Sequence, residues 1–127
     1  MMRKMEVTKL GIEDQTYCPV IVLKDPDGNS SLQVSIGLME ATYIASGVEQ
    51  VHFPRPVIHD LLTNLFNILG VTVNWIEIRG RLDNTSCALI DLSVRKIRFR
   101  IDSRPSDAIA IALRTNSQIY VNEALLD

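Results

Sequence analysis

The alternation of apolar and polar residues along the chain predicts a sheet of short strands interrupted by helices. Runs with a period of two, or apolar runs bounded by turn residues, are typical of strands. Such runs cover residues 6–12, 19–24, 32–36, 71–78, 86–92, 97–102 and 119–121. Turn-forming residues at 25–29, 81–85 and 95–96 separate neighbouring strands and favour hairpins. We therefore expect antiparallel hairpins in the sheet.

Three further segments have the apolar spacing of helices. They cover residues 38–48, 57–69 and 105–113, and a short stub helix is expected at 122–127. The second is the most amphipathic, so we expect its leucines and isoleucines to face the core and His59 and Asp60 to point away from it. The predicted fold class is α+β, a single domain over residues 1–127 with an antiparallel, hairpin-rich sheet covered by about three helices.

The composition narrows the classes of function. A chain of 127 residues is long enough to bury one core. Its formal charge of -2 argues against a protein that mainly binds nucleic acid non-specifically. The charge is uneven, however, because residues 79–127 carry eight basic and six acidic side chains. Lys96, Arg98 and Arg100 form a basic stripe that can follow phosphates, lie in solvent or contact another copy.

Neither a secretion signal nor a membrane span is predicted. The first residues mix charged and apolar side chains, and no apolar run approaches the roughly 18 residues that a span needs. Cys18 and Cys87 are far apart and match no metal-ligand spacing, so we expect a reduced, cytoplasmic protein without membrane contact. The sequence also has no HExxH, no CxxC and no glycine-rich phosphate loop. This argues against the zinc, thiol and nucleotide-phosphate sites that these motifs form.

The densest group of reactive side chains lies where a predicted strand meets the most apolar predicted helix. It contains Asp102, Arg104, Ser106 and Asp107. A helix N-terminus presents free backbone N–H groups and the positive end of the helix dipole, which favour an anion. The same residues also suit a structural role, with Ser106 or Asp107 as the cap and Arg104 as an ion-pair partner. The residues alone leave both interpretations open.

Three motifs together resemble the bifunctional nuclease domain family. They are Ile36-Gly37 with Glu40-Ala41, then Pro54-Arg55-Pro56 with His59-Asp60-Leu61-Leu62, and then Asp102 to Ala110, followed by Arg114-Thr115 and Ile119-Tyr120-Val121. Their order and spacing agree over roughly residues 5–126. The chain departs from the family pattern at residues 83–87, where aromatic residues are usual, and at Ile58, where threonine is common. The first departure removes aromatic rings on which bases could stack.

The resemblance implies a nuclease that hydrolyses phosphodiester bonds of RNA, DNA or both, with metal assistance. If the motifs converge, the candidate ligands of a divalent ion, Mg²⁺ or Mn²⁺, are Glu40, Asp60, Asp102 and Asp107. The candidate phosphate-binding residues are Arg55, Arg104 and Ser106, and the candidate catalytic residues are His59, Asp60, Asp102 and Asp107, with His59 as general base or acid.

The expected partners are single-stranded RNA or DNA and a second copy of the chain. A homo-oligomer, with a dimer as the simplest form, would protect the edge strands that several hairpins create. The alternative to a nuclease is a non-catalytic, oligomeric binding or regulatory module. In that case the charged residues at the strand-to-helix junction serve the packing of the domain.

Overall fold

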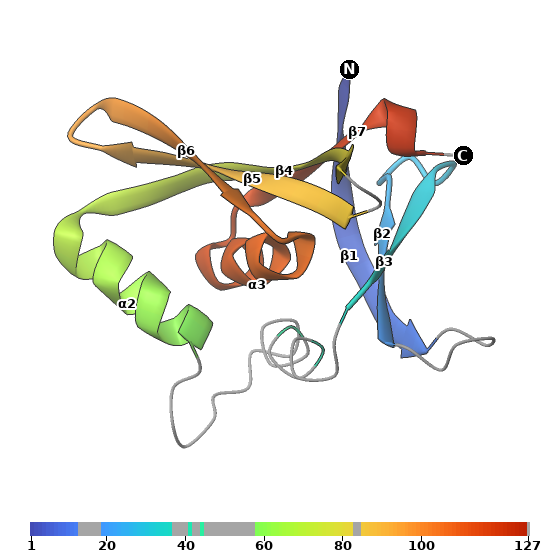
Figure 1. The fold of residues 1–127 in the computed structure, drawn as a ribbon, viewed down its shortest axis with the longest axis horizontal. Coiled ribbons are helices and arrows are strands. Elements are labelled where there is room, and N and C mark those ends of the chain that lie inside the picture. Colours follow the sequence, from blue (N-terminus) through green and yellow to red (C-terminus); the bar gives the residue numbers. More distant parts are fainter. Residues whose placement is uncertain (13–18, 37–40, 42–43, 45–57, 83–84, 127) are drawn as a thin grey trace.

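The computed structural model describes residues 1–12, 19–36, 41, 44, 58–82 and 85–126. Its strands are β1 (Met2–Ile12), β2 (Pro19–Lys24), β3 (Ser31–Ser35), β4 (Val71–Leu82), β5 (Thr85–Val94), β6 (Ile97–Ser103) and β7 (Gln118–Asn122). The helices are α2 (Ile58–Leu69), α3 (Pro105–Thr115) and the 3-10 helix η1 (Glu123–Leu125) (Figure 1). Most of the predicted helix at 38–48 lies outside the described residues, but Ala41 and Ile44, which are described, are helical. Bounds can be given for two α-helices, α2 and α3.

The seven strands form one mixed sheet in the order β3-β2-β1-β7-β4-β5-β6. The neighbours β2–β3, β4–β5 and β5–β6 pair antiparallel, as the turn residues predict, and β1 and β2 also pair antiparallel. β7 differs, because it lies between β1 and β4 and runs parallel to β4. The expectation of an antiparallel sheet therefore needs correction at β7, which returns to the sheet after α3. Such a crossover pairs strands distant in sequence, and local periodicity does not reveal it.

Both α-helices lie on the same side of the sheet (Figure 1), and α3 is the more deeply buried. Ala108, Ile109 and Ala110 in α3 have no exposed surface. They pack in one cluster with strand residues that include Ile76 and Ile78. The core thus lies between α3 and the sheet: α3 contacts β4, β5 and β7, and the same cluster extends to Met5, Ile21, Leu23 and Val34 of β1, β2 and β3. Because nearly every side of the first two turns of α3 is covered, its sequence is an apolar run rather than an amphipathic pattern.

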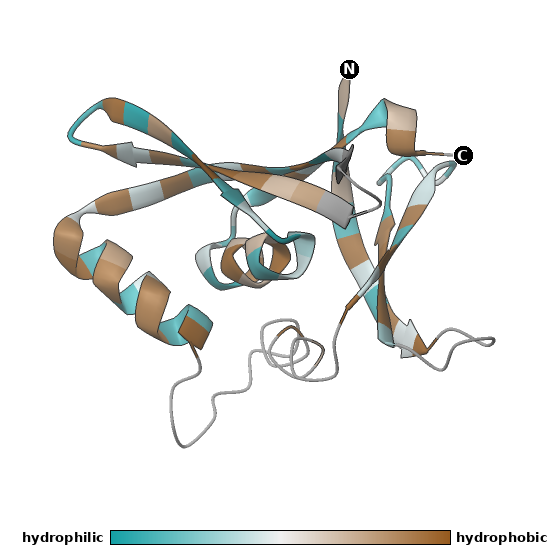
Figure 2. Cartoon of the chain, in the orientation of Figure 1, coloured by the Kyte–Doolittle hydropathy of each residue, from teal (hydrophilic) through white to brown (hydrophobic). Residues whose placement is uncertain are grey.

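In α2 the buried and exposed sides differ from the prediction. His59 is buried, and Leu62 and Phe66 pack against the core, so the buried stripe has the helical spacing i, i+3, i+7. The prediction that His59 points away from the core is therefore wrong. Several apolar residues expected inside are exposed by 42% to 79%, namely Ile58, Leu61, Leu65, Ile68 and Leu69. The apolar surface of α2 (Figure 2) is wider than the surface that α3 and β4 offer it.

β6 forms an edge of the sheet, next to β5. By strand alternation, Ile97, Phe99 and Ile101 share the helix side of the sheet with the residues they oppose in β5. They are nevertheless 49% to 59% exposed. Arg98 and Arg100 lie on the opposite face, as their period of two predicts. An edge strand has a neighbour on one side only, which explains why its apolar residues stay half exposed.

The chain after β7 forms the expected stub helix in a shorter form, the single turn η1. Asn122 caps it, because its side-chain oxygen accepts a hydrogen bond from the N–H of Ala124 at 3.1 Å. Within the described ranges, no helix is both long enough and apolar enough to cross a membrane.

Candidate functional site

The candidate site lies at the junction between β6 and α3. β6 ends at Ser103, and Arg104 follows as the helix N-cap with an extended backbone at φ -73° and ψ 149°. Pro105 begins the helix, where its missing N–H costs no hydrogen bond. The N–H of Ala108 donates to the carbonyl of Arg104 at 3.1 Å, so the strand passes directly into the helix. The N-cap is Arg104 rather than Ser106 or Asp107, which leaves the Asp107 carboxylate for other partners.

Asp107 lies between a buried histidine and an exposed arginine. Nε2 of His59, from α2, lies 3.0 Å from Oδ1 of Asp107. Arg104 holds the same carboxylate with two groups, because its Nε donates to Oδ2 at 2.9 Å and its Nη2 donates to Oδ1 at 3.1 Å. The side chains are 3% exposed for His59, 31% for Asp107 and 62% for Arg104. The carboxylate therefore connects the interior between the two helices with a guanidinium that faces solvent.

The electrostatics of this corner keep Asp107 ionised. Burial alone raises the pKa of Asp107, because it removes water from the carboxylate. Hydrogen bonds from Arg104 and His59, together with the charge of Arg104, outweigh burial and hold the pKa below its ordinary value of 3.8. The place of Asp107 in the first turn of α3 adds the favourable end of the helix dipole. Asp107 can therefore accept hydrogen bonds at neutral pH but is a weak proton acceptor.

A second ion pair joins the two helices through Arg114, a residue that the sequence did not indicate as part of a site. Its Nε donates to Oδ1 of Asp60 at 2.8 Å, and its Nη1 donates to the carbonyl of Ala110 at 3.3 Å. The Arg114 side chain is only 8% exposed and that of Asp60 is 28% exposed. Two signals were available: Arg114 belongs to the residues that carry the family resemblance, and it follows Asp107 by two turns and so shares its side of α3.

The other predicted site residues lie apart from this corner or outside the described residues. Asp102 lies near the end of β6, opposite Leu89, and strand alternation places it on the sheet face that turns away from the helices. Ser106 is buried in the first turn of α3. Glu40 and Arg55 lie outside the described residues. Of the predicted residues, the structure thus brings together His59, Arg104 and Asp107, and it pairs Asp60 with Arg114.

The carboxylates of the described residues do not form the predicted site for Mg²⁺ or Mn²⁺ by themselves. In that part of the chain, no three His, Cys, Asp or Glu side chains are grouped so that they could hold a metal ion. Asp60 is engaged by Arg114, and Asp107 by Arg104 and His59. Hard divalent cations take several oxygen ligands, so no step of a reaction can be derived through such an ion from these residues.

Fold and site together define a small α+β protein whose strand-to-helix junction presents an arginine held by a carboxylate. The family model of the bifunctional nuclease domain matches residues 21–127. The chain therefore belongs to the bifunctional nuclease domain family, and the resemblance carried by its three motifs is confirmed.

Similar proteins occur in bacteria and plants. An uncharacterized protein of Mycobacterium tuberculosis is 35% identical over 125 residues, which covers 98% of this chain and 74% of the relative. Bifunctional nuclease 2 of Oryza sativa subsp. japonica is 33% identical over 113 residues, with 84% of this chain and 34% of the relative covered. Bifunctional nuclease 1 of Arabidopsis thaliana is 31% identical over 120 residues, with coverages of 90% and 36%. The chain thus spans about a third of the length of these plant relatives.

Proposed function

We propose that the chain hydrolyses phosphodiester bonds of single-stranded RNA or DNA at the corner formed by His59, Arg104 and Asp107. The carrying observation is the Arg104 guanidinium, which is 62% exposed and fixed in direction by two hydrogen bonds to Asp107. A guanidinium offers planar N–H donors that suit phosphate oxygens. Membership of the family, and plant relatives named bifunctional nuclease, support this class of reaction.

In the proposed reaction, the oxygen of a water molecule bonds to phosphorus and the bond from phosphorus to the leaving sugar oxygen breaks. Arg104 contacts the phosphate and stabilises the negative charge that builds on its oxygens. Asp107 accepts a hydrogen bond from the attacking water and orients it. The proton that this water loses goes to solvent, and the leaving oxygen takes up a proton from solvent.

His59 acts in this proposal as a positioning residue. Its side chain is 3% exposed, and its Nε2 already contacts Asp107. It therefore works through the orientation of Asp107 rather than on the substrate, which we prefer to the role of general base or acid that the sequence suggested. A neutral or a charged imidazole can make this hydrogen bond, provided that the proton lies on Nε2.

The test is cleavage of labelled single-stranded RNA and DNA by the purified wild type and by Arg104→Gln and Asp107→Asn. Each assay is run with Mg²⁺, with Mn²⁺ and with chelator, because the metal requirement is part of the question. Loss of one donor to a developing negative charge costs about 100-fold in rate or more, so we expect at least that loss in Arg104→Gln. Lys24→Gln changes the charge equally at the exposed end of β2 and serves as the control for contaminating nuclease. Equal cleavage by all four folded proteins would overturn the proposal.

The second candidate is a non-catalytic binding or regulatory module, and one observation favours it. The contacts at the site also tie α2 to α3, through His59 with Asp107 and through Asp60 with Arg114. Arginine and carboxylate clusters of this kind are also found with structural roles alone. If the wild type cleaves nothing under any of the three conditions, this second function takes first place.

We also propose that the protein works in the cytoplasm as a homodimer. β6 is a sheet edge with half-exposed apolar side chains. Such an edge favours pairing with another strand, and a second copy supplies one of the same shape.

A further inference from the structure

The sheet face opposite the two helices carries arginines and aromatic rings. Strand pairing places Arg100 opposite Asp91, Asp91 opposite Trp75, and Glu77 opposite Tyr120, so these side chains from β6, β5, β4 and β7 share one face. α2 and α3 lie on the other side (Figure 1). Because this face packs against neither helix, packing of the hydrophobic core does not account for the side chains on it.

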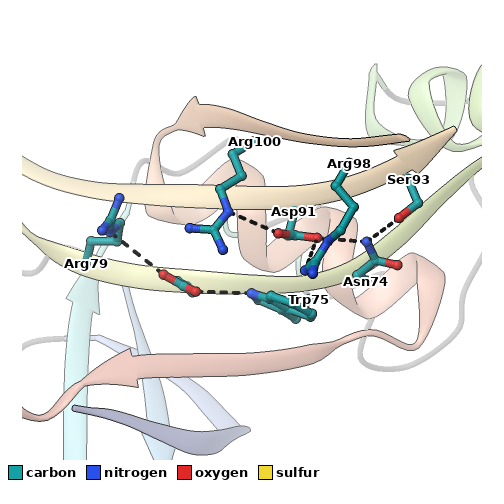
Figure 3. Close-up of polar contacts among 8 residues, drawn as sticks. Asn74, Trp75, Arg79, Asp91, Ser93, Arg98 and Arg100 are labelled. Atoms are coloured by element: carbon teal, nitrogen blue, oxygen red, sulfur yellow. Dashed lines mark hydrogen bonds and ion pairs between the residues drawn. The ribbon is translucent and has the colours of Figure 1, made fainter. Parts of the chain in front are cut away.

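A wholly buried carboxylate lies at the centre of this face. Asp91 has no exposed surface. Nη2 of Arg98 donates to its Oδ1 at 3.0 Å, and Nε of Arg100 donates to its Oδ2 at 3.2 Å. Nδ2 of Asn74 donates to Oδ1 at 2.7 Å and also to Oγ of Ser93 at 2.7 Å. Figure 3 shows the two arginines reaching Asp91 from β6 across the strand.

This network fixes two positive charges above one negative charge. The side chains of Arg98 and Arg100 are 54% and 53% exposed, although each has one edge held by Asp91. The three charges leave a net charge of +1 at the surface. Fixing the guanidinium groups before a ligand arrives reduces the conformational entropy that binding must overcome. The arrangement is thus suited to an anion with repeated charges, such as a nucleic-acid backbone.

An aromatic pair lies directly beside the arginines. The guanidinium carbon of Arg98 lies 4.6 Å from the centroid of the Trp75 ring. The ring of Tyr120 meets Trp75 edge to face, with centroids 6.5 Å apart and an interplanar angle of 85°. Nε1 of Trp75 donates to Oε1 of Glu77 at 3.1 Å, which sets the orientation of the indole. Nucleobases stack both on aromatic rings and on guanidinium planes.

From this combination we infer that the face formed by Trp75, Arg98, Arg100 and Tyr120 binds single-stranded nucleic acid. Arg98 and Arg100 contact phosphates, and bases stack on the layer that Arg98 and Trp75 form. The inference rests on the proposed function for its substrate class, and it adds a binding surface on the opposite face of the sheet from the cleavage corner. Glu77 and Asp102 also lie on this face, but Glu77 is engaged by Trp75 and Arg79 and Asp102 lies at the strand end.

The experiment uses the fluorescence of Trp75, which is the only tryptophan of the chain. An oligothymidylate of about 12 nucleotides is titrated in chelator at low salt, so that binding is observed without cleavage. We expect saturable quenching, weaker binding by Arg98→Gln and Arg100→Gln, and unchanged binding by Lys24→Gln. Loss of one phosphate contact should lower the slope of log K against log salt by about 0.7 for each arginine.

A labelled oligothymidylate, followed by anisotropy, tests the ring itself. Trp75→Leu should bind about 5- to 150-fold more weakly, which is the range for one lost stacking contact, whereas Trp75→Phe should retain most of the affinity. Circular dichroism checks that each variant is folded. Absence of quenching in the wild type, or equal affinity and salt slope in the folded Arg98→Gln and Arg100→Gln proteins, would overturn the inference. So would a change of oligomeric state without any change in binding, because the two arginines would then serve only the contact between copies that is proposed for β6.

Failure of this inference and failure of the proposed function give different results. Asp107→Asn should lose cleavage but retain quenching of Trp75. If the oligonucleotide quenches Trp75 in the wild type but is not cleaved, the result supports the binding face and rules out the proposed nuclease activity. If Arg98→Gln still cleaves and its affinity for the oligonucleotide is unchanged, the result supports cleavage at the corner of His59, Arg104 and Asp107 and rules out the binding face.

Discussion

Asp91 and Asp107 are stabilised in the same way although one is wholly buried and the other reaches solvent. For each carboxyl group, burial raises the pKa, and hydrogen bonds and charges from its neighbours outweigh that effect. For Asp91 these are the hydrogen bonds from Asn74 and Arg98 and the charges of Arg98 and Arg100. Both pKa values are therefore lowered from 3.8. Each group binds its proton less readily in the folded chain than in the unfolded one, which links folding to pH.

This linkage predicts how Asp91→Asn behaves with pH. The ionised Asp91 contributes its stability in full above its unfolded pKa of about 3.8, and the contribution disappears as the pH falls through the lower folded pKa. At neutral pH we expect the variant to be less stable by about 1.5–3 kcal/mol, because hydrogen bonds to a charged group are lost. Urea unfolding of both proteins at neutral pH and at steps below 3.8 measures this. A difference in stability that does not shrink in acid would contradict the assignment.

Among the properties of single residues, the sequence predicts the burial of polar side chains least well. His59 stands between Ile58 and Asp60 at the start of α2, and its polar character assigns it to the solvent side. Its burial depends on Asp107, a partner 48 residues away. Asp91 likewise occupies a strand position whose alternation suggests exposure, and its partners come from two neighbouring strands. By contrast, Arg104 and Asp107 could be selected from sequence because both lie at a recognisable strand-to-helix junction.

Among the elements, α2 and α3 are held together by polar contacts as well as by apolar packing. The Asp60–Arg114 pair lies between them, at 2.8 Å, with the arginine 8% exposed. A pair with so little solvent around it is screened less than a surface pair. The strength of the Asp60–Arg114 pair therefore shows whether the charged residues near the site stabilise the packing of α2 against α3.

A double-mutant cycle with Asp60→Asn and Arg114→Gln tests the strength of that contact. We expect a favourable coupling free energy between about 0.5 and 3 kcal/mol from urea unfolding. The same cycle on Arg3 and Glu123, which are 3.3 Å apart and 38% and 36% exposed, is the matched control. For that pair we expect at most about 1 kcal/mol. If the Asp60–Arg114 coupling is no larger than that of the exposed pair, the contact contributes little to holding α2 against α3.

Local sequence patterns predicted the type of each element, but they did not predict which strands β7 pairs with. The alternating runs predicted every described strand, and the turn residues predicted the hairpins β2–β3, β4–β5 and β5–β6. The ends were less accurate: β1 starts at Met2, and β4 extends to Leu82, beyond the predicted turn start. The place of β7 between β1 and β4 depends on contacts between distant parts of the chain. Periodicity within a short run carries no information about such contacts.

For the whole molecule, the distribution of exposed apolar side chains is uneven. Of the ten large hydrophobic residues exposed in the described part of the chain, eight belong to α2 or β6. Figure 2 shows apolar positions along both elements. Single exposed apolar residues are ordinary, but a concentration of them on two elements indicates surfaces that contact another protein. On β6 these side chains lie along a free edge of the sheet.

For the homodimer proposed above, the sequence of β6 favours one register of pairing with a second copy. In an antiparallel pair centred on Arg100, Phe99 of one copy lies opposite Ile101 of the partner subunit. Arg98 then lies opposite Asp102 of the partner subunit, so unlike charges meet on the other face. A shift by one residue would place apolar side chains opposite charged ones and is disfavoured. The two Arg100 side chains meet at the axis, where each is already held by Asp91 of its own chain.

The last prediction follows from this register. Asp102→Arg places like charges opposite each other twice in the dimer. Phe99→Glu places a charge on the apolar face of the strand pair. Both variants should therefore be monomers. Asp102→Asn removes the attraction without adding repulsion and should leave a weaker dimer. Both altered side chains are exposed in the single chain, so folding should be retained, which circular dichroism can verify. Light scattering after size exclusion measures the mass of each protein. A wild type that is monomeric at all concentrations, or folded Asp102→Arg and Phe99→Glu proteins that remain dimers, would show that β6 does not form the contact between copies.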